Sequence, residues 1–172
     1  MVRAIVVADT SVLINFLRID RMDLIEAHPA SFIATDHVAG EIADTYPEQQ
    51  TRYAAALNAG QITEQRIDDS AELEIFLRLA AKGRLGAGER AAIAVALNRG
   101  CALAIDDSRA IRRALQEATL GENALSILRT QDIVVELIQK GVVSVEAADA
   151  IQVDWATNHR FKLKIVSFQD LS

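Results

Sequence analysis

The fold class of this 172-residue chain is decided by residues 2–11, Val2-Arg3-Ala4-Ile5-Val6-Val7-Ala8-Asp9-Thr10-Ser11. Residues 2–8 form a short apolar run with several β-branched side chains, which predicts a buried strand. Asp-Thr-Ser follows directly, and these residue types are typical of a helix start. A buried strand that leads straight into a helix favours a parallel sheet covered by helices.

Short strands and helices alternate along the rest of the chain. Further strands are expected over residues 31–34, 62–67 and 101–105. Helices are expected from Asp36, from Pro47 to about residue 60, and over residues 71–81, 88–98, 108–117, 122–139 and 145–157. This alternation predicts an α/β fold, a parallel sheet with helices on both faces.

Two features near the C-terminal end have alternatives that stay open. Residues 161–168 alternate apolar and basic side chains at first, so they form a strand or a tail that pairs with a partner. A helix face packs against the chain's own core, the favoured alternative, or against a second chain in a homodimer. This face carries Ile127, Val134, Leu137 and Ile138.

The composition is that of one globular domain over residues 1–172, with a helical extension and tail from about residue 141. Hydrophobic residues make up 51% and charged residues 24%, with 8 Gly and 2 Pro, which excludes a disordered or collagenous chain. The single Cys101 cannot form an internal disulfide and the N-terminus lacks a secretion-signal pattern, so a cytoplasmic protein is expected. No apolar run approaches the roughly 20 residues that span a bilayer.

Charge is unevenly distributed along the chain. The net charge is −6, but residues 75–116 hold eight basic and three acidic side chains, so this window carries +5 and the remainder −11. Such a window holds nucleic-acid phosphates or is a solvated helix face. Its basic members are Arg78, Lys82, Arg84, Arg90, Arg99, Arg109, Arg112 and Arg113.

Acidic side chains gather at the expected strand ends. Asp9 ends the first strand, and Asp106 with Asp107 ends the strand at 101–105, so all three belong to one edge of a parallel sheet. Glu41 lies inside a predicted helix and Glu89 in the first turn of a strongly apolar one. Each acid alone can be a helix cap or can answer a helix dipole. Capping does not explain why two buried strands both end in acids.

Several carboxylates in one apolar crevice raise one another's pKa unless they share protons or bind a cation. Hard oxygen ligands select Mg²⁺ or Mn²⁺. Zinc and thiolate chemistry are not indicated, because Cys101 has no partner cysteine and His28, His37 and His159 stand at no metal-binding spacing. The glycines of Gly86-Ala87-Gly88 are expected to give freedom to the chain that enters the next helix.

Four segments together resemble the PIN-domain nuclease family, with order and spacing kept over residues 2–113. They are Ala8-Asp9-Thr10-Ser11-Val12-Leu13-Ile14, Val38-Ala39-Gly40-Glu41-Ile42, Gly88-Glu89-Arg90-Ala91-Ala92-Ile93-Ala94 and Ala104-Ile105-Asp106-Asp107-Ser108-Arg109-Ala110. The resemblance implies a three-layer α/β/α sandwich with a central parallel sheet. Many VapC-type toxins of this family carry Asp where this chain has Glu89, but its Gly-Glu-x-Ala form resembles a known subgroup. The last 30 or so residues, by contrast, match nothing in the resemblance.

The resemblance also implies roles for individual residues. The catalytic and metal-binding acids would be Asp9, Glu41, Glu89 and Asp107, with Asp106 as an adjoining candidate ligand. Thr10 and Ser11 would offer a hydroxyl to a metal-bound water, or cap the helix. Substrate phosphates are expected at Arg90, Arg109, Arg112 and Arg113.

The implied activity is that of a Mg²⁺- or Mn²⁺-dependent endoribonuclease, the toxin of a toxin–antitoxin pair. RNA and an antitoxin protein are then the expected partners. Two alternatives stay open, a housekeeping RNA-processing nuclease and a non-catalytic protein-binding module. A phosphoryl-transfer enzyme fits less well, because Asp9-Thr10-Ser11 lacks the second aspartate of a D-x-D motif and no lysine follows a late buried strand as expected.

Overall fold

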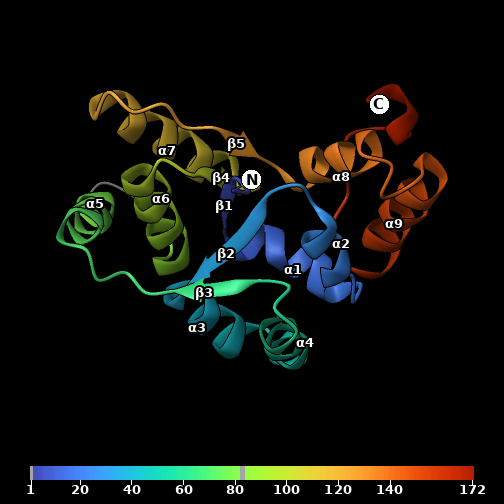
Figure 1. Cartoon of the computed structure of the whole chain (residues 1–172), viewed down its shortest axis with the longest axis horizontal. Helices are drawn as coiled ribbons and strands as arrows, with labels where there is room; N and C mark the ends of the chain where they lie inside the picture. The colour runs from blue at the N-terminus through green and yellow to red at the C-terminus, as the bar shows by residue number, and fades with distance from the viewer. Residues whose placement is uncertain (1, 82–83) are drawn as a thin grey trace.

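The sheet at the centre of the molecule is parallel throughout (Figure 1). In residues 2–81 and 84–172, which the computed structural model describes, five strands form it in the order β3-β2-β1-β4-β5. The strands are β1 (Ile5–Ala8), β2 (Ser31–Thr35), β3 (Thr63–Gln65), β4 (Ala102–Ala104) and β5 (Ile127–Leu128). The predicted α/β fold with a central parallel sheet is confirmed.

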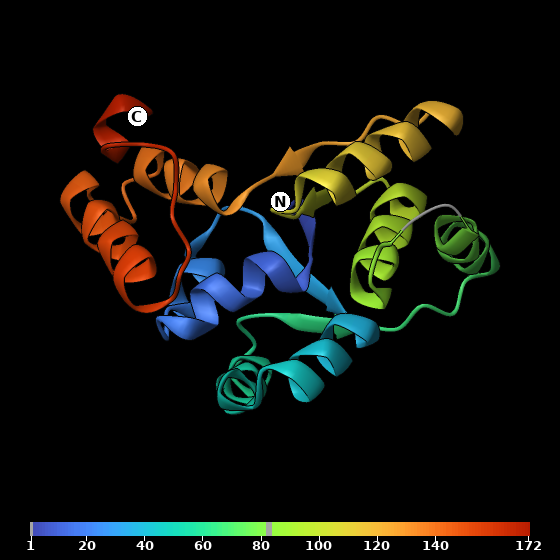
Figure 2. The ribbon, with the colours of Figure 1, turned by 180° about the vertical axis from the view of Figure 1, so that it is seen from behind.

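Helices connect the strands and extend the chain beyond them. They are α1 (Thr10–Arg18), α2 (Met22–Ala27), α3 (Asp36–Thr45), α4 (Pro47–Asn58), α5 (Ser70–Ala81), α6 (Ala87–Arg99), α7 (Ser108–Leu120), α8 (Thr130–Gln139) and α9 (Val145–Asn158). Figure 1 shows α5, α6 and α7 gathered on one side of the sheet and α8 and α9 on the other. Seen from behind in Figure 2, α1 lies between the α3–α4 pair and the α8–α9 pair.

Alternate residues of the strands pack into two separate hydrophobic cores, one on each face of the sheet. Val6 and Ala8 of β1 pack with α1, α2, α3, α4, α8 and α9, whereas Val7 packs with α5, α6 and α7. Side chains along a strand alternate between faces, so a sheet covered on both sides needs apolar residues at every position. This is why the run at residues 5–8 lacks a polar alternation.

One expected helix is wrong in its first half. Residues 122–139 were expected to be a single helix, but the helix begins only at Thr130. Glu122 adopts a left-handed backbone (φ 55°), and the segment after it extends into β5, which pairs with β4. The short helix α2 was not expected, because six residues carry too little apolar periodicity to be recognised.

The C-terminal segment packs on its own chain. Phe168 is fully buried, its backbone N–H donates to Asp149 Oδ1 of α9 (2.8 Å), and Gln152 Nε2 donates to the Ile165 carbonyl (3.0 Å). Residues 161–168 therefore form no strand, and this segment packs on its own chain through Ile165 and Phe168. Of the helical face discussed above, Val134 and Leu137 are buried in the chain's own core. None of the described helices is long and apolar enough to cross a membrane.

Candidate functional site

The ends of two neighbouring strands bring the predicted acids together. β1 and β4 are adjacent in the sheet, and the Asp9 backbone N–H donates to the Ala104 carbonyl (2.8 Å). Asp9 therefore lies beside the chain that continues into Asp106 and Asp107. Their common location at the C-terminal edge of a parallel sheet follows from the topology.

Asp9 is the buried centre of the site. It caps α1, and its Oδ2 accepts hydrogen bonds from the backbone N–H (3.1 Å) and the hydroxyl (2.7 Å) of Ser11. Its Oδ1 is buried and has no hydrogen-bond donor among the described residues. Burial, together with the nearby Glu89 and Glu41 carboxylates, raises the pKa of Asp9 from 3.8 to about 6. The carboxylate thus has a free oxygen and an uncompensated charge.

Glu41 reaches this centre from α3. One of its oxygens accepts a hydrogen bond from the Thr10 hydroxyl (2.8 Å) and the other from the Gly88 backbone N–H (2.8 Å). A Cβ at residue 88 would lie 2.5 Å from Glu41 Oε2. The glycine is therefore needed for close approach of a carboxylate, a different reason from the predicted freedom of the chain that enters the helix.

Glu89 lies at the start of α6, where its Oε2 accepts a hydrogen bond from the Gly86 backbone N–H (2.9 Å). Burial raises its pKa, and the nearby Asp107 and Glu41 carboxylates raise it further, while Arg109 lowers it. Asp107 caps α7 by accepting from the Arg109 and Ala110 backbone N–H groups (2.9 Å each). Four of the predicted acids thus share one electrostatic neighbourhood.

Asp106 has a different set of contacts. Its carboxylate accepts hydrogen bonds from Asn15 Nδ2 (3.1 Å), the Thr130 backbone N–H (2.9 Å) and the Thr130 hydroxyl (2.6 Å). Its own backbone N–H donates to Ser11 Oγ (3.1 Å). Burial raises the pKa of Asp106, although the bonds from Thr130 oppose that change. These contacts connect the end of β4 to α1 and α8.

A cavity of about 340 Å³ opens beside Asp9. Its lining includes Thr10, Ser11, Glu41 and Glu89. In the described part of the chain, no three His, Cys, Asp or Glu side chains are arranged to hold a metal ion as they stand. The donor set nevertheless suits Mg²⁺ or Mn²⁺, because it consists of hard oxygens and includes the buried Asp9 Oδ1, which has no donor of its own.

The arginines predicted to hold phosphates have diverse surroundings. Arg90 stacks on the Phe76 ring, 4.4 Å from its centroid. Arg113 pairs with the buried Glu117 (3.3 Å), whereas Arg109 and Arg112 are exposed on α7. Lys82, in the same basic window, lies outside the described residues. Arg109 lowers the pKa of Glu89, so its positive charge acts directly on one of the predicted acids.

Three residues of this region were missed from the sequence. Asn15, buried in α1, donates to Asp106 and to the Thr130 hydroxyl (3.1 Å), and its own carbonyl accepts from Trp155 Nε1 (2.8 Å). An asparagine inside an otherwise apolar helix was the available signal, since a buried amide needs partners. Thr130 and Trp155 carried no comparable signal, because they lie 115 and 140 residues from Asn15.

Comparison with protein families gives a match. A family model described as a PIN domain matches residues 5–165, nearly the whole chain. None of the curated proteins matches it.

Proposed function

The chain belongs to the PIN-domain family, whose members are generally nucleases that use divalent metal ions, and from this premise we propose that it is a Mg²⁺- or Mn²⁺-dependent endoribonuclease. The proposal rests on one observation above all, the buried Asp9 carboxylate with its unpartnered Oδ1 beside Glu41 and Glu89. A buried anion without a partner is costly. A divalent cation would compensate this charge and would give Oδ1 a ligand role.

Asp9, Glu41, Glu89 and Asp107 would hold the metal. When bound, a divalent cation lowers the pKa of a coordinated water and neutralises charge on a phosphodiester. Ser11 orients the Asp9 carboxylate through two hydrogen bonds, and Thr10 orients Glu41 through one. We assign Asp106 a positioning role instead, because three hydrogen bonds already occupy its carboxylate.

RNA is the proposed substrate. Arg109, whose charge acts on Glu89, would hold its phosphates near the acids, and Arg112 is the other exposed member of the predicted set. We further propose that the protein is the toxin of a toxin–antitoxin pair, with an antitoxin that covers the acids. A housekeeping RNA-processing role is the alternative, and a small overlapping upstream gene would favour the toxin.

Cleavage of RNA with Mg²⁺ or Mn²⁺ tests the activity directly. We expect the wild type to cut and Asp9→Asn to lose at least about 100-fold in rate. Asp170→Asn, an exposed aspartate in the C-terminal turn, is the matched control and should cut like the wild type. Equal rates in the wild type and Asp9→Asn would reject the assignment. Calorimetric titration with Mn²⁺ should show weaker binding in Glu89→Gln.

A further inference from the structure

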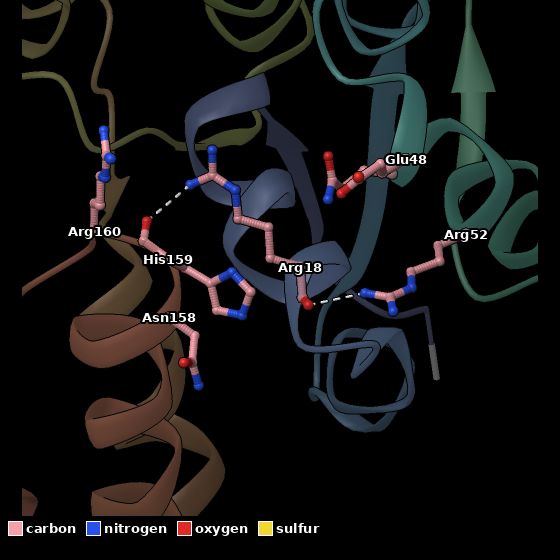
Figure 3. Close-up of a pocket in the computed structure, with 7 residues that line it drawn as sticks. Arg18, Glu48, Arg52, Asn158, His159 and Arg160 are labelled. Carbon is pink, nitrogen blue, oxygen red and sulfur yellow. Dashed lines mark hydrogen bonds between the residues drawn. The ribbon is translucent and has the colours of Figure 1, made fainter.

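A second cavity, of about 620 Å³, lies at the opposite end of α1 from Asp9. Figure 3 shows the side chains around it, which come from the end of α1, from α4 and from the end of α9. The residues that carry the argument are Arg18, Arg52, His159 and Arg160. Neither the predicted acids nor the predicted arginines lie here.

The cavity is predominantly basic. Three guanidinium groups and one imidazole line it, and Glu48 is the one acid in its described lining. Two more carboxylates lie at its margin at long range. Asp20 is 3.9 Å from Arg52 Nε, and Asp154 is 3.7 Å from His159 Nε2.

The basic side chains keep donors for a ligand. Arg52 uses Nη1 for the carbonyls of Leu17 (2.7 Å) and Arg18 (2.8 Å), which end α1. Arg18 donates one long bond to the His159 carbonyl (3.4 Å). In residues 2–81 and 84–172, the Arg160 side chain makes no hydrogen bond or ion pair. A guanidinium offers five N–H donors, so most of this capacity stays free.

Arg160 occupies a position that favours glycine. It follows α9 with a left-handed backbone (φ 55°). Glycine adopts this conformation without strain, whereas another residue is held there at a cost of about 1 kcal/mol. A charged side chain at such a position, with no partner in the described chain, points to a role in binding.

Tyr46 connects this cavity to the acid cavity. It lines the cavity beside Asp9, and the Arg18 guanidinium lies over its ring, 5.6 Å from the centroid. The nine residues of α1 separate the two cavities by about 13 Å. Tyr46 is half-buried, and an aromatic ring between an acidic and a basic site resembles the stacking platforms on which single-stranded nucleic acid lies.

We propose that Arg18, Arg52, His159 and Arg160 form a phosphate-binding subsite for the RNA backbone, and that the strand reaches it from the acid cavity across Tyr46. This inference rests on the proposed nuclease function. RNA is favoured over an acidic protein segment, because Arg18 of the subsite lies over Tyr46, which lines the site at which a phosphodiester would be cut.

Binding without cleavage is the first test. A labelled single-stranded RNA of about 12 nucleotides is titrated in chelator at several salt concentrations. Arg160→Gly removes the charge and relieves the left-handed strain, so we expect a melting temperature equal to that of the wild type or a few degrees higher. We expect about tenfold weaker binding and a salt slope smaller by about 0.7. Arg160→Lys should keep most of the affinity, and Lys140→Gln, at the far end of α8, should keep all of it.

Cleavage of two substrates then separates the subsite from the acid cavity. With the 12-nucleotide RNA, Arg160→Gly should raise KM about tenfold and leave kcat unchanged. A dinucleotide, too short to reach the subsite, should be cut equally by both proteins.

Other results would refute either the subsite or the nuclease proposal. If Arg160→Gly binds the RNA as well as the wild type, or if the wild type binds none, the subsite is refuted. An equal loss on both substrates also refutes it, because the effect would then act through the acid cavity. If the wild type binds RNA but cuts none, and Arg160→Gly still weakens binding, the nuclease proposal fails while the subsite stands.

Discussion

Replacing Asp9 by asparagine should stabilise the metal-free protein at neutral pH. Asn keeps a carbonyl oxygen for the two donors of Ser11 and removes the charge from a side chain that is 2% exposed. The wild type carries that charge in the folded state with no donor on Oδ1 in the described chain. Activity and stability are therefore expected to change in opposite directions.

The size of the effect follows from the pKa of Asp9, which burial raises from 3.8 to about 6. Each tenfold change in proton affinity corresponds to about 1.4 kcal/mol, so the ionised carboxylate destabilises the fold by about 3 kcal/mol at most. In a chain of this length, 1 kcal/mol shifts the melting temperature by about 2–4 °C. Asp9→Asn should therefore melt up to about 10 °C higher at pH 8.

The pH dependence has a definite sign. Because the pKa of Asp9 is higher in the folded than in the unfolded protein, protonation favours the folded state. The advantage of Asp9→Asn should be largest above pH 6 and should disappear as the pH falls from 6 toward 3.8. Thermal melting in chelator, at a series of pH values, measures this difference.

Metal addition supplies the second arm of this experiment. Mn²⁺ at about 100 times its dissociation constant should stabilise the wild type by about 2.7 kcal/mol and leave Asp9→Asn unchanged. Asp170→Asn should follow the wild type throughout. The reasoning is refuted if Asp9→Asn melts lower than the wild type at pH 8 in chelator, or if Mn²⁺ stabilises both proteins equally.

Two further predictions follow from other contacts. Gly88→Ala puts a Cβ 2.5 Å from a Glu41 oxygen, so RNA cleavage should fall about 10–100-fold. Gly40→Ala, whose Cβ would meet nothing within 4 Å, should cut normally, and equal loss in both variants would contradict the role of Glu41. The second prediction concerns His28. Its Nδ1 accepts a hydrogen bond from the Ala30 backbone N–H, and its Nε2 lies 2.6 Å from Glu136 Oε2. Burial lowers the pKa of His28. Below its ordinary pKa of 6.5 the wild type should lose stability relative to His28→Gln in urea unfolding, and parallel pH curves would contradict this.

The sequence could predict the parts of this molecule that local pattern determines. The apolar run at residues 2–8 predicted a buried strand, which the structure has at Ile5–Ala8, and Asp9 directly after it marked the edge where acids meet. Glu41 and Glu89 could be nominated from the resemblance of their segments. That Glu41 accepts the Gly88 backbone N–H at the start of α6 could not be predicted, because it depends on how α3 packs against α6. The bond from Gly86 to Glu89 is local, because it joins residues three positions apart at the start of the helix.

Which of Asp106 and Asp107 is the metal ligand also could not be decided from the sequence. Both residues follow β4, so their sequence environments are nearly identical. Asp106 is distinguished by donors from Asn15 and Thr130, one of them 91 residues away along the chain. Long-range hydrogen bonds of this kind leave no pattern in either segment, so only the folded chain separates the two aspartates.

The net charge of a sequence window did not predict how many of its arginines are free to bind a ligand. The basic window at 75–116 carries +5, yet several of its arginines neutralise buried acids. Arg99 pairs with Glu72 (2.9 Å), and Arg78 and Arg113 both pair with Glu117 (3.1 and 3.3 Å). Glu72 and Glu117 have side chains only 1% exposed, so removing their partners would leave buried charges uncompensated.

The basic cavity, unlike the basic window, is built from residues that lie far apart in the sequence. Its basic side chains come from positions 18, 52, 159 and 160, all in the part of the chain whose net charge is −11. They meet only because the C-terminal ends of α1 and α9 lie beside the first half of α4. A phosphate responds to donors that are free and convergent rather than to the net charge of a segment. Substitutions at Arg160 should therefore affect RNA binding more than substitutions at Arg78 or Arg113, although the sequence alone favoured the basic window.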